Sequence, residues 1–445
     1  MSRSVARSSI LVLLIACGAL DLRAQQTAFQ PTFSLTFGSP TTFATHAELA
    51  SYGFAWGVSD GLFGAIPRGN GNYTFYGGAG CNSNCAGTPA GAAGVFSFNG
   101  TLTQVTGSNG CKRLFGPGSA APGWTFDRDY AGGGKVVRFS SGGMTGWLMT
   151  FHAEYHWKNM ANPPSYWCFI GNSTTSAVPC FYSSIGLAVS IDDGKTFQVA
   201  GQIIQPSQPV TVFEGGTGNM DVGYGSLVVA DANGKHLDNP PPNPSKAYFY
   251  VLYSDFLPGL SGACGQYHCA ALARAAYADT VAAALSGDPN RVAQLFHKYD
   301  GSSPNPWNQP ATAWAQGSAT PDLSGFAGKF APLWTDDVVN EPDVLYDSAF
   351  DVYLVVYPYQ GARMRASKDL IHWSPHFSTS FSESGNLLAY LTLQGESGDP
   401  TIGGVTPRLY FSIFPTGVFP DYTKATFESV PITLTTSPKR RSARH

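Results

Sequence analysis

Residues 190–197 read Ser-Ile-Asp-Asp-Gly-Lys-Thr-Phe, a pattern that predicts a tight turn between two antiparallel strands. The Asp192 carboxylate can accept hydrogen bonds from backbone N–H groups two residues further on, and Gly194 can adopt a positive φ at little steric cost. The ring of Phe197 is then placed to pack back between sheets. We therefore expect a structural role, and no part in catalysis, for the residues that define this octet: Ser190, Asp192, Gly194, Thr196 and Phe197.

The composition favours many short strands over long helices. The 445 residues carry a net charge of -3, with 12% charged residues, 13% aromatic residues and 51 glycines. A chain of this length can bury a large core, and its charge is too near zero for a protein that binds nucleic acid or an anionic membrane. Abundant glycine suits turns, and abundant aromatic side chains suit surfaces that stack on sugar rings.

The N-terminus has the pattern of an export signal over residues 1–24. Arg3 and Arg7 precede an apolar run at 10–16, which is too short to span a bilayer, and Ala24 is a suitable cleavage site. Residues 14–17 also fit a bacterial lipobox, so lipidation at Cys17 is the alternative and the one route to a membrane. In either case we expect a secreted, periplasmic or outer-surface protein, in a compartment where disulfides form.

Seven cysteines follow the export signal, and six of them form close pairs in loop-like stretches. The pairs are Cys81 with Cys85, Cys168 with Cys180, and Cys264 with Cys269. Their spacings do not repeat as those of a zinc motif would, so we expect local disulfides. Cys111 is left without a partner in this scheme.

A unit of three strands recurs along the chain. The strongest strands are aromatic-rich and lie at 72–77, 147–152, 248–254, 352–357 and 408–414. Weaker apolar strands precede them at 61–66, 135–139, 225–230, 342–346 and 387–393. Third strands follow most of them, at 94–98, 185–190, 270–275 and 362–367. Five such units predict an all-β chain that forms a five-bladed β-propeller, with six blades as the alternative, in a single domain over residues 30–436.

Three further elements complete this prediction. The last unit lacks a strand, and residues 32–37 are expected to supply it and close the ring. A short helical insertion is predicted at 280–285, with Asp279 as its N-cap, and continues from Asp288-Pro289 to Phe296. Residues 437–445 form a basic tail that we expect to be disordered.

Propeller geometry places the start of each innermost strand on the same face as the end of the second strand. Acidic residues precede the innermost strands: Asp60, Asp127, Asp129, Asp221, Glu341 and Asp343. Polar and aromatic residues end the second strands: His152, Glu154, His156, Trp157, Tyr253, Asp255, Tyr357 and Tyr359. We expect both sets to converge on the mouth of one central funnel, and the 190–197 turn to lie on the opposite face.

Converging carboxylates and aromatic rings suit glycoside hydrolysis. One carboxylic acid protonates the leaving oxygen, while a second carboxylate activates water or attacks the anomeric carbon. Asp60, Glu154, Asp221 and Asp129 are the catalytic candidates. Substrate-binding candidates are His152, His156, Trp157, Asp255, Glu341, Asp343, Arg363 and Arg365. Acidic residues before strands also serve as turn-formers and caps, and arginines as surface charges, so a structural role stays open for each.

The alternating residues His152, Glu154 and His156 share one face of a strand. They suit the wall of a pocket with Glu154 as a catalytic acid. Two other interpretations stay open: a metal site, which would need a further ligand, and a hydrogen-bonded polar strand end.

The octet matches the pattern known as the Asp-box, and residues 367–373 (Ser-Lys-Asp-Leu-Ile-His-Trp) are a relaxed version of it. With the blade repeat, these turns resemble the propeller glycosidases, which include the five-bladed furanosidases of glycoside hydrolase families 43 and 32 and the six-bladed sialidases. The resemblance implies that Asp60 is the base and Asp129 the second aspartate. It places a glutamate acid near the third blade, where Asp221 stands with Glu214 upstream, so Glu154 is the other candidate for the acid.

The resemblance leaves three functions open. The first is a hydrolase of furanoside-type polysaccharides or oligosaccharides, which requires no cofactor and leaves a structural Ca²⁺ open. The second is a sialidase-like enzyme, although only one strict box is found and no Arg-Ile-Pro-like segment precedes it. The third is a propeller that binds glycan or protein without catalysis.

Overall fold

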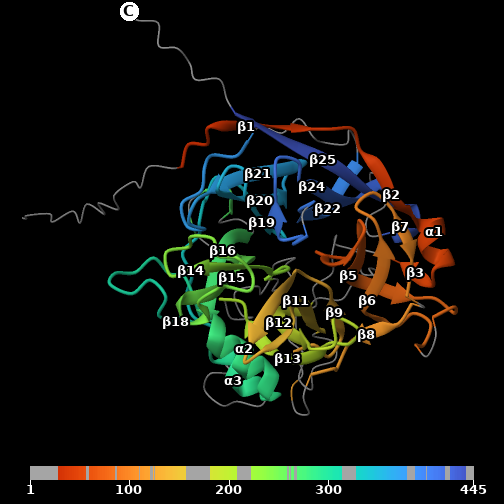
Figure 1. The fold of residues 1–445 in the computed structure, drawn as a ribbon, viewed down its shortest axis with the longest axis horizontal. Coiled ribbons are helices and arrows are strands. Elements are labelled where there is room, and N and C mark those ends of the chain that lie inside the picture. The colour runs from red at the N-terminus through yellow and green to blue at the C-terminus, as the bar shows by residue number, and fades with distance from the viewer. Residues whose placement is uncertain are drawn as a thin grey trace, which may run out of the picture.

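The computed structural model describes residues 29–56, 60–85, 88–109, 111–120, 124, 126–156, 181–207, 222–257, 260, 262–264, 268–312, 327–377, 386–396, 398–415 and 421–436. Within these residues, five β-sheets follow one another around a ring (Figure 1). The predicted export signal, the Cys168–Cys180 pair and the basic tail lie outside the described residues.

Each sheet is one blade. Blade 1 contains β4 (Gly64–Gly69), β5 (Asn72–Cys81) and β6 (Ala93–Gly100), with the shorter β3 (Phe54–Trp56), β7 (Val105–Gly107) and β8 (Arg113–Phe115). Blade 2 contains β10 (Val136–Ser141), β11 (Met144–His156), β12 (Phe181–Ser190) and β13 (Gln198–Ile204), with β9 (Tyr130–Gly132) paired to β11. Blade 3 contains β14 (Ser226–Asp231), β15 (Ala247–Phe256), β16 (His268–Ala276), β17 (His297–Lys298) and β18 (Gln309–Pro310).

The last two blades complete the ring. Blade 4 contains β19 (Asp343–Asp347), β20 (Val352–Pro358) and β21 (Ala362–Ser367), with β23 (Ile402–Gly403) parallel to β19. Blade 5 contains β22 (Asn386–Gln394), β24 (Arg408–Pro415), β25 (Thr426–Thr436), β1 (Phe33–Phe37) and β2 (Thr41–Thr45). The five-bladed prediction is confirmed, and each predicted strand overlaps an observed one.

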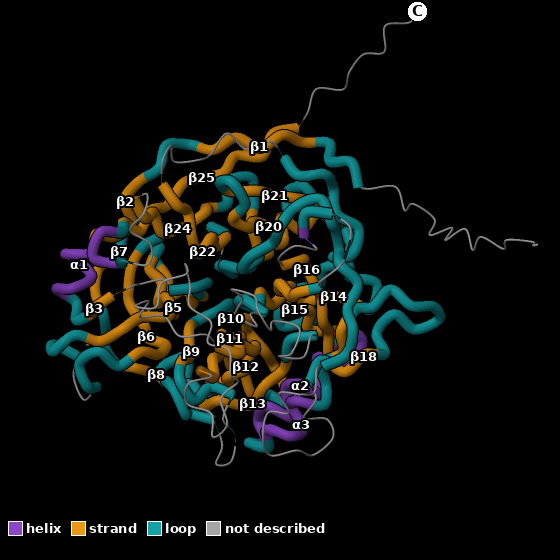
Figure 2. The backbone as a smooth tube through the Cα atoms, turned by 180° about the vertical axis from the view of Figure 1, so that it is seen from behind, coloured by secondary structure: helices purple, strands orange, loops and turns teal. Residues whose placement is uncertain are grey.

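Ring closure comes from the N-terminal segment. Strand β1 pairs antiparallel with β25, from Phe33 opposite Thr436 to Phe37 opposite Ile432, and β2 pairs with the earlier part of β25. The first described strand therefore completes the last blade, as predicted for residues 32–37, and Figure 2 shows this seam from behind. Closing the ring in this way leaves few exposed sheet edges.

The core is divided among the five boundaries between neighbouring blades. Between blades 5 and 1, for example, the rings of Phe43, Phe63 and Tyr410 meet edge to face at centroid distances of 5.1 Å. Similar buried clusters lie between the other neighbouring blades. The aromatic-rich second strands that marked the repeat supply many of the rings in these clusters, such as Tyr410, Phe249 and Tyr353, because large flat side chains fill the wedge between two twisted sheets.

Helices are short and lie at the outside of the ring. Helix α1 (His46–Ser51) begins with a capping box between Thr45 and Glu48. Helices α2 (Tyr277–Ser286) and α3 (Pro289–Ala293) pack against strands of blades 2 and 3. The described residues also include the single 3-10 turns η4 (Pro244–Lys246) and η7 (Tyr422–Lys424).

The N-cap predicted for the first of the two inserted helices is wrong. Helix α2 starts three residues earlier than expected, so Ala276 occupies the N-cap and Asp279 lies within the first turn. A carboxylate there is favourable to the helix dipole but caps no backbone N–H. Asp288 does cap α3, since its side chain accepts from the backbone N–H of Asn290.

The 190–197 octet forms a turn at the end of β12, with one correction to its predicted hydrogen bonds. The Asp192 carboxylate accepts from the backbone N–H of Thr196 at 3.0 Å and from its hydroxyl at 2.6 Å, so the donors lie four residues on and not two. Ser190 Oγ donates to the same carboxylate and accepts from the N–H of Gly194, which has a φ of 76°.

This turn also joins two blades. Arg68 of blade 1 donates to the carboxylate of Asp193 at 2.6 Å, and the Tyr76 hydroxyl donates to the carbonyl of Gly194. The turn lies next to Trp147, which pairs with Ser190, whereas Glu154 is seven residues further along β11. At the strand rise of about 3.3 Å per residue, the two ends are roughly 23 Å apart. The turn and the predicted acid therefore lie at opposite ends of blade 2.

The innermost strands of four blades meet at a buried ion pair. Lys135, just before β10, donates to the Asp343 carboxylate at 2.7 Å and to the carbonyl of Leu393 at 2.5 Å. The same carboxylate accepts from the Ser226 hydroxyl and from the backbone N–H of Leu393, both at 2.6 Å. Both charged side chains are at most 1% exposed. We call Lys135, Ser226, Asp343 and Leu393 the central clamp.

Cysteine pairing is resolved in part. Cys264 and Cys269 form the predicted disulfide. The sulfur of Cys85 lies at bonding distance from both Cys81, its predicted partner, and Cys111. No helix within the described ranges is both long and apolar enough to cross a membrane.

The clamp makes a prediction about stability. Lys135→Met leaves the Asp343 carboxylate buried without its cation, so the free energy of unfolding should fall by about 3–5 kcal/mol. Lys135→Met combined with Asp343→Leu removes both charges and should recover much of that loss. The control is Lys368→Met, because the Lys368 ammonium is exposed and 3.9 Å from Asp351. It should cost at most about 1 kcal/mol. Denaturant unfolding followed by tryptophan fluorescence compares them, and similar losses at both lysines would contradict the assignment.

Candidate active site

Asp60 lies in the segment that leads into β4 and is held by tyrosines from other blades. Its carboxylate accepts from the hydroxyl of Tyr130 at 2.7 Å and from that of Tyr422 at 2.5 Å. The hydroxyl of Tyr224 donates to the Asp60 carbonyl at 2.8 Å, and the hydroxyl of Tyr390 lies 2.9 Å from that of Tyr422. Blades 2, 3 and 5 thus supply four phenols around a carboxylate from blade 1.

Burial raises the pKa of the Asp60 carboxyl above its ordinary value, and the hydrogen bonds from Tyr130 and Tyr422 act in the opposite direction. The charge of Glu154 raises the same pKa further, which places that second carboxylate within electrostatic reach of Asp60. Burial also raises the pKa of all four tyrosines well above the ordinary value, so they are hydrogen-bond donors and not anions.

His152 and Glu154 form a pair on one face of β11. Nδ1 of His152 is 3.1 Å from the carbonyl of Gly223, which can only accept, so this nitrogen carries a proton. Nε2 of the same ring is 3.1 Å from Oε1 of Glu154. A hydrogen bond there requires one further proton, which resides on either the carboxyl or the imidazole. His152 and Glu154 therefore share one proton, close to Asp60. The orientation of this pair is supported by Tyr224, whose ring stacks on His152 at 4.5 Å.

A third carboxylate is near this group. Glu341 precedes the first residue of β19 by two positions, and its charge raises the pKa values of Tyr224, Tyr390 and Tyr422. Its backbone is in the left-handed region, with a φ of 45°. Such a conformation is unusual for a residue with a side chain, and functional sites are enriched in it.

Tyr390 has a second unusual backbone conformation, with a φ of 60°. It lies in a β-bulge of β22, where the register against β24 shifts between Ala389 and Thr392. A bulge redirects a side chain out of the regular alternation of a strand. Here it brings the Tyr390 hydroxyl to that of Tyr422 above Asp60.

Every blade thus contributes to one group of residues, which we call the Asp60 cluster: Asp60, Tyr130, His152, Glu154, Tyr224, Glu341, Tyr390 and Tyr422. Most of them lie just before the innermost strands or at the end of a second strand. This is where the sequence predicted that acidic and polar residues would meet.

Two of the predicted acids have buried cationic partners instead. Asp343 belongs to the central clamp. Asp255 accepts from the Lys298 ammonium at 3.0 Å and from the Ser207 hydroxyl at 2.6 Å, and both ions are at most 1% exposed. Their binding of substrate stays a prediction, but the contacts observed for both are internal to the protein.

Asp127 and Asp129 come just before Tyr130 of the cluster in the chain. Burial raises the pKa of Asp127 to about 6, and one of its oxygens accepts from the backbone N–H of Ala120, which ties a loop together. The backbone N–H of Asp129 donates to the carbonyl of Glu154 at 3.0 Å. A catalytic role for Asp129 stays a prediction.

The two arginines predicted to bind substrate are engaged within blade 4. Arg365 is buried and donates to Asp336 at 2.7 Å and to Asp337 at 2.6 Å, so its alternative interpretation as a surface charge is wrong. Arg363 donates to His376 at 2.6 Å. Asp336, Asp337 and His376 have the chemistry of metal ligands, but the guanidinium of Arg365 already supplies a positive charge to both carboxylates.

Three predicted site residues cannot be placed. Asp221 and Trp157 lie outside the described residues, and so does the side chain of His156, whose backbone ends β11. Their roles stay predictions, as does a metal site that would include His156.

Sequence reasoning missed the tyrosines. Tyr130 and Tyr224 stand in the same strand-entry segments as the quoted acidic residues, so recurrence of Tyr at those positions was a usable signal. No such sequence signal marked Tyr390 and Tyr422, since a β-bulge and a 3-10 turn bring them to the Asp60 cluster.

Comparison with known proteins identifies similar solved structures at low sequence identity. No family model and no curated protein matches the chain. The α-L-arabinofuranosidase PaAbf62A from Podospora anserina, in complex with cellotriose, is similar with a TM-score of 0.44 and 10% identity, over 92% of this chain and 99% of that one. A GH62 α-L-arabinofuranosidase domain from Coprinopsis cinerea has a TM-score of 0.41 and 10% identity, over 91% and 98%. A family 117 glycoside hydrolase from Zobellia galactanivorans has a TM-score of 0.41 and 10% identity, over 90% of each chain.

The close packing of the tyrosines makes a prediction about Gly61. A Cβ atom there would lie 2.0 Å from the ring of Tyr224, and the φ of Gly61 is 106°. Gly61→Ala should therefore lower the free energy of unfolding by about 2–5 kcal/mol, through overpacking and backbone strain together. Gly71→Ala is the matched control, because Gly71 also has a positive φ but has open space around it. It should cost about 1–2 kcal/mol. Equal losses in denaturant unfolding would show that the ring does not constrain Gly61.

Proposed function

We propose that this chain is a glycoside hydrolase that cleaves neutral, furanoside-type sugars with Asp60 and Glu154 as its paired carboxylates. The observation that supports it most is the Asp60 cluster, in which carboxylates from separate blades meet among tyrosines. Hydrolysis of a glycosidic bond needs one carboxyl group that donates a proton and one that is ionised.

The surroundings of the two carboxyl groups suggest which one is the base or nucleophile and which one is the general acid. Asp60 accepts two phenolic hydrogen bonds, which favour its ionised form and suit a base or nucleophile. Glu154 shares a proton with His152, whose other nitrogen is held by the carbonyl of Gly223. That arrangement suits a general acid, because the proton shared by the imidazole and the carboxyl oxygen can be passed to the leaving oxygen through Glu154, and the imidazole is fixed in orientation.

The charges near Asp60 favour a neutral substrate over an anionic one. The carboxylates whose charge raises these pKa values are Glu154 for Asp60, and Asp60 and Glu341 for Tyr390. An anionic sugar would be repelled by this potential. The sialidase-like alternative requires guanidinium groups on the substrate carboxylate, and Arg363 and Arg365 are engaged in blade 4.

A non-catalytic, glycan-binding propeller is the second candidate, because tyrosine and carboxylate groups also bind sugars by stacking and hydrogen bonding.

We further propose export of the chain, from the signal pattern at residues 1–24, with attachment to a membrane only through lipidation at Cys17. The proposed chemistry needs no cofactor, and a structural Ca²⁺ is left as a sequence prediction.

Single substitutions distinguish the glycoside hydrolase from the non-catalytic glycan-binding propeller. Asp60→Asn and Glu154→Gln should each lower kcat/KM on a cleaved glycan by about 10²–10⁴-fold, because each removes a proton-transfer or nucleophilic group. Asp238→Asn changes an exposed carboxylate at the other end of blade 3 and should leave turnover unchanged. A panel of arabinans, arabinoxylans, fructans, sialyl-oligosaccharides and polyuronides identifies the substrate. Binding without turnover by the native chain would favour the glycan-binding candidate, and neither binding nor turnover would overturn both.

The pKa of Asp60 makes a prediction about pH dependence. A base acts in its ionised form, and burial raises this pKa, so the acid limb of kcat/KM should lie above that of an exposed aspartate. Tyr422→Phe removes a hydrogen bond that lowers the pKa and should move the acid limb to higher pH. Tyr52→Phe, at the end of α1, is the control. A limb that stays in place or moves to lower pH in Tyr422→Phe would contradict the role of Asp60 as the base.

A further inference from the structure

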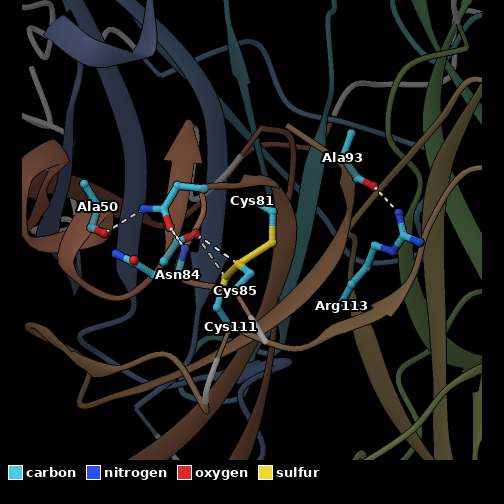
Figure 3. The surroundings of a disulfide bond; sticks show 9 residues. Ala50, Cys81, Asn84, Cys85, Ala93, Cys111 and Arg113 are labelled. Atoms are coloured by element: carbon cyan, nitrogen blue, oxygen red, sulfur yellow. Dashed lines mark hydrogen bonds between the residues drawn. A yellow bond between two sulfur atoms is a disulfide. The ribbon is translucent and has the colours of Figure 1, made fainter. Parts of the chain in front are cut away.

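Three buried cysteines that are not members of the Asp60 cluster meet at the end of β5 in blade 1. Cys81 ends β5, Cys85 follows four residues later, and Cys111 comes after β7; all three side chains are at most 7% exposed. Figure 3 shows their side chains converging, with Cys85 between the other two. The Cys85 sulfur lies at bonding distance from both neighbours. Because one sulfur forms one disulfide, either pairing leaves a third thiol buried beside it.

In the reduced state all three sulfurs are available as metal ligands. We propose that the three thiols, in their reduced state, bind one thiophilic d¹⁰ cation of the Zn²⁺ class. Their ligand atoms all lie within 4.8 Å of one another, as a single ion requires. The Cys81-x₃-Cys85 spacing falls within the range of two to four intervening residues that is common for cysteine ligands of zinc.

The sulfur positions agree with this coordination. The Cys81 and Cys111 sulfurs are 3.8 Å apart. Two sulfurs that each lie about 2.3 Å from a tetrahedral Zn²⁺ are separated by about 3.8 Å, so this edge of the tetrahedron is already formed. The Cys85 sulfur lies at bonding distance from both neighbours and must move away from them to occupy the third corner.

A fourth ligand, a backbone carbonyl oxygen, is available at the same place. The carbonyl oxygen of Gly53 lies 3.0 Å from the Cys85 sulfur and 3.2 Å from the Cys111 sulfur. The backbone N–H of Asn82 donates to this oxygen at 2.8 Å and fixes its direction. Groups that orient a ligand in this way tune a metal site.

Gly53 is itself adapted to the three sulfurs. Its φ is 103°, and a Cβ atom there would lie 2.8 Å from the Cβ of Cys111 and 3.4 Å from the Cys85 sulfur. Only glycine allows the backbone to approach this closely in that conformation. The surrounding rings of Phe54 and Phe96 shield the site from water.

The thiols are reduced when the chain is synthesised, so a cation that binds before the disulfides form needs no redox partner. Three thiols release three protons, three metal–sulfur bonds form, and the charge of the thiolates is neutralised in part by the cation. The site would also hold β5 in place. Gly78, three residues before Cys81, accepts a hydrogen bond from the Asp60 N–H at 3.2 Å. The proposal is independent of the proposed glycosidase activity.

Titration with Cd²⁺ as a spectroscopic probe tests the site. The full chain, reduced with a phosphine and confirmed as folded by circular dichroism, should develop an ultraviolet thiolate-to-metal charge-transfer band that saturates at about one Cd²⁺ per chain. Zn²⁺ should compete for the site and raise the thermal unfolding midpoint of the reduced protein, because it binds the folded state.

Substitutions identify the ligands. Cys81→Ser, Cys85→Ser and Cys111→Ser should each lower the plateau of the band by about a third, since one of three thiolates is lost. The double variant Cys264→Ser, Cys269→Ser is the control and should retain the full plateau. A folded, reduced native chain without a saturable band would overturn the proposal, and so would an unchanged band in Cys85→Ser.

Discussion

The ion pair between Lys135 and Asp343 is the interaction on which the inner architecture depends. It joins the segment before β10 to the start of β19, and its carboxylate also accepts hydrogen bonds from Ser226 and Leu393. Two opposite charges buried to this degree are tolerated because each neutralises the other and both are hydrogen-bonded to further groups. The result is a single point at which the innermost strands of four blades are held in register.

The clamp also explains why the candidate site is where it is. Tyr224 stands two residues before Ser226, Glu341 two before Asp343, and Tyr390 three before Leu393. Fixing the clamp residues therefore fixes the strand entries that carry the Asp60 cluster. Such support is needed, because Glu341 and Tyr390 have left-handed backbones that an unsupported loop would relax. The carboxylates of the site lie near an ion pair whose two charges cancel, so the clamp does not offset their negative potential.

The strand repeat and much of the site could be predicted from sequence, but the partners of individual residues could not. Asp60, Glu154, Asp255 and Asp343 all show the same local pattern of a carboxylate at the edge of a strand. The structure divides them, since Lys298 neutralises Asp255 and Lys135 neutralises Asp343, while Asp60 and Glu154 lie among tyrosines. Each lysine comes from a different part of the chain, so no spacing rule connects it to its aspartate.

The sequence by itself determined the order of strands, the N-terminal strand that closes the ring, and the face on which acidic residues gather. These follow from local alternation, aromatic content and turn chemistry, which act over a few residues. Only the tertiary structure decided which carboxylates remain available for chemistry, how four tyrosines surround Asp60, and which three cysteines meet. Those outcomes depend on residues far apart in the chain, such as Tyr422 and Asp60, whose proximity comes from the ring and not from sequence neighbourhood.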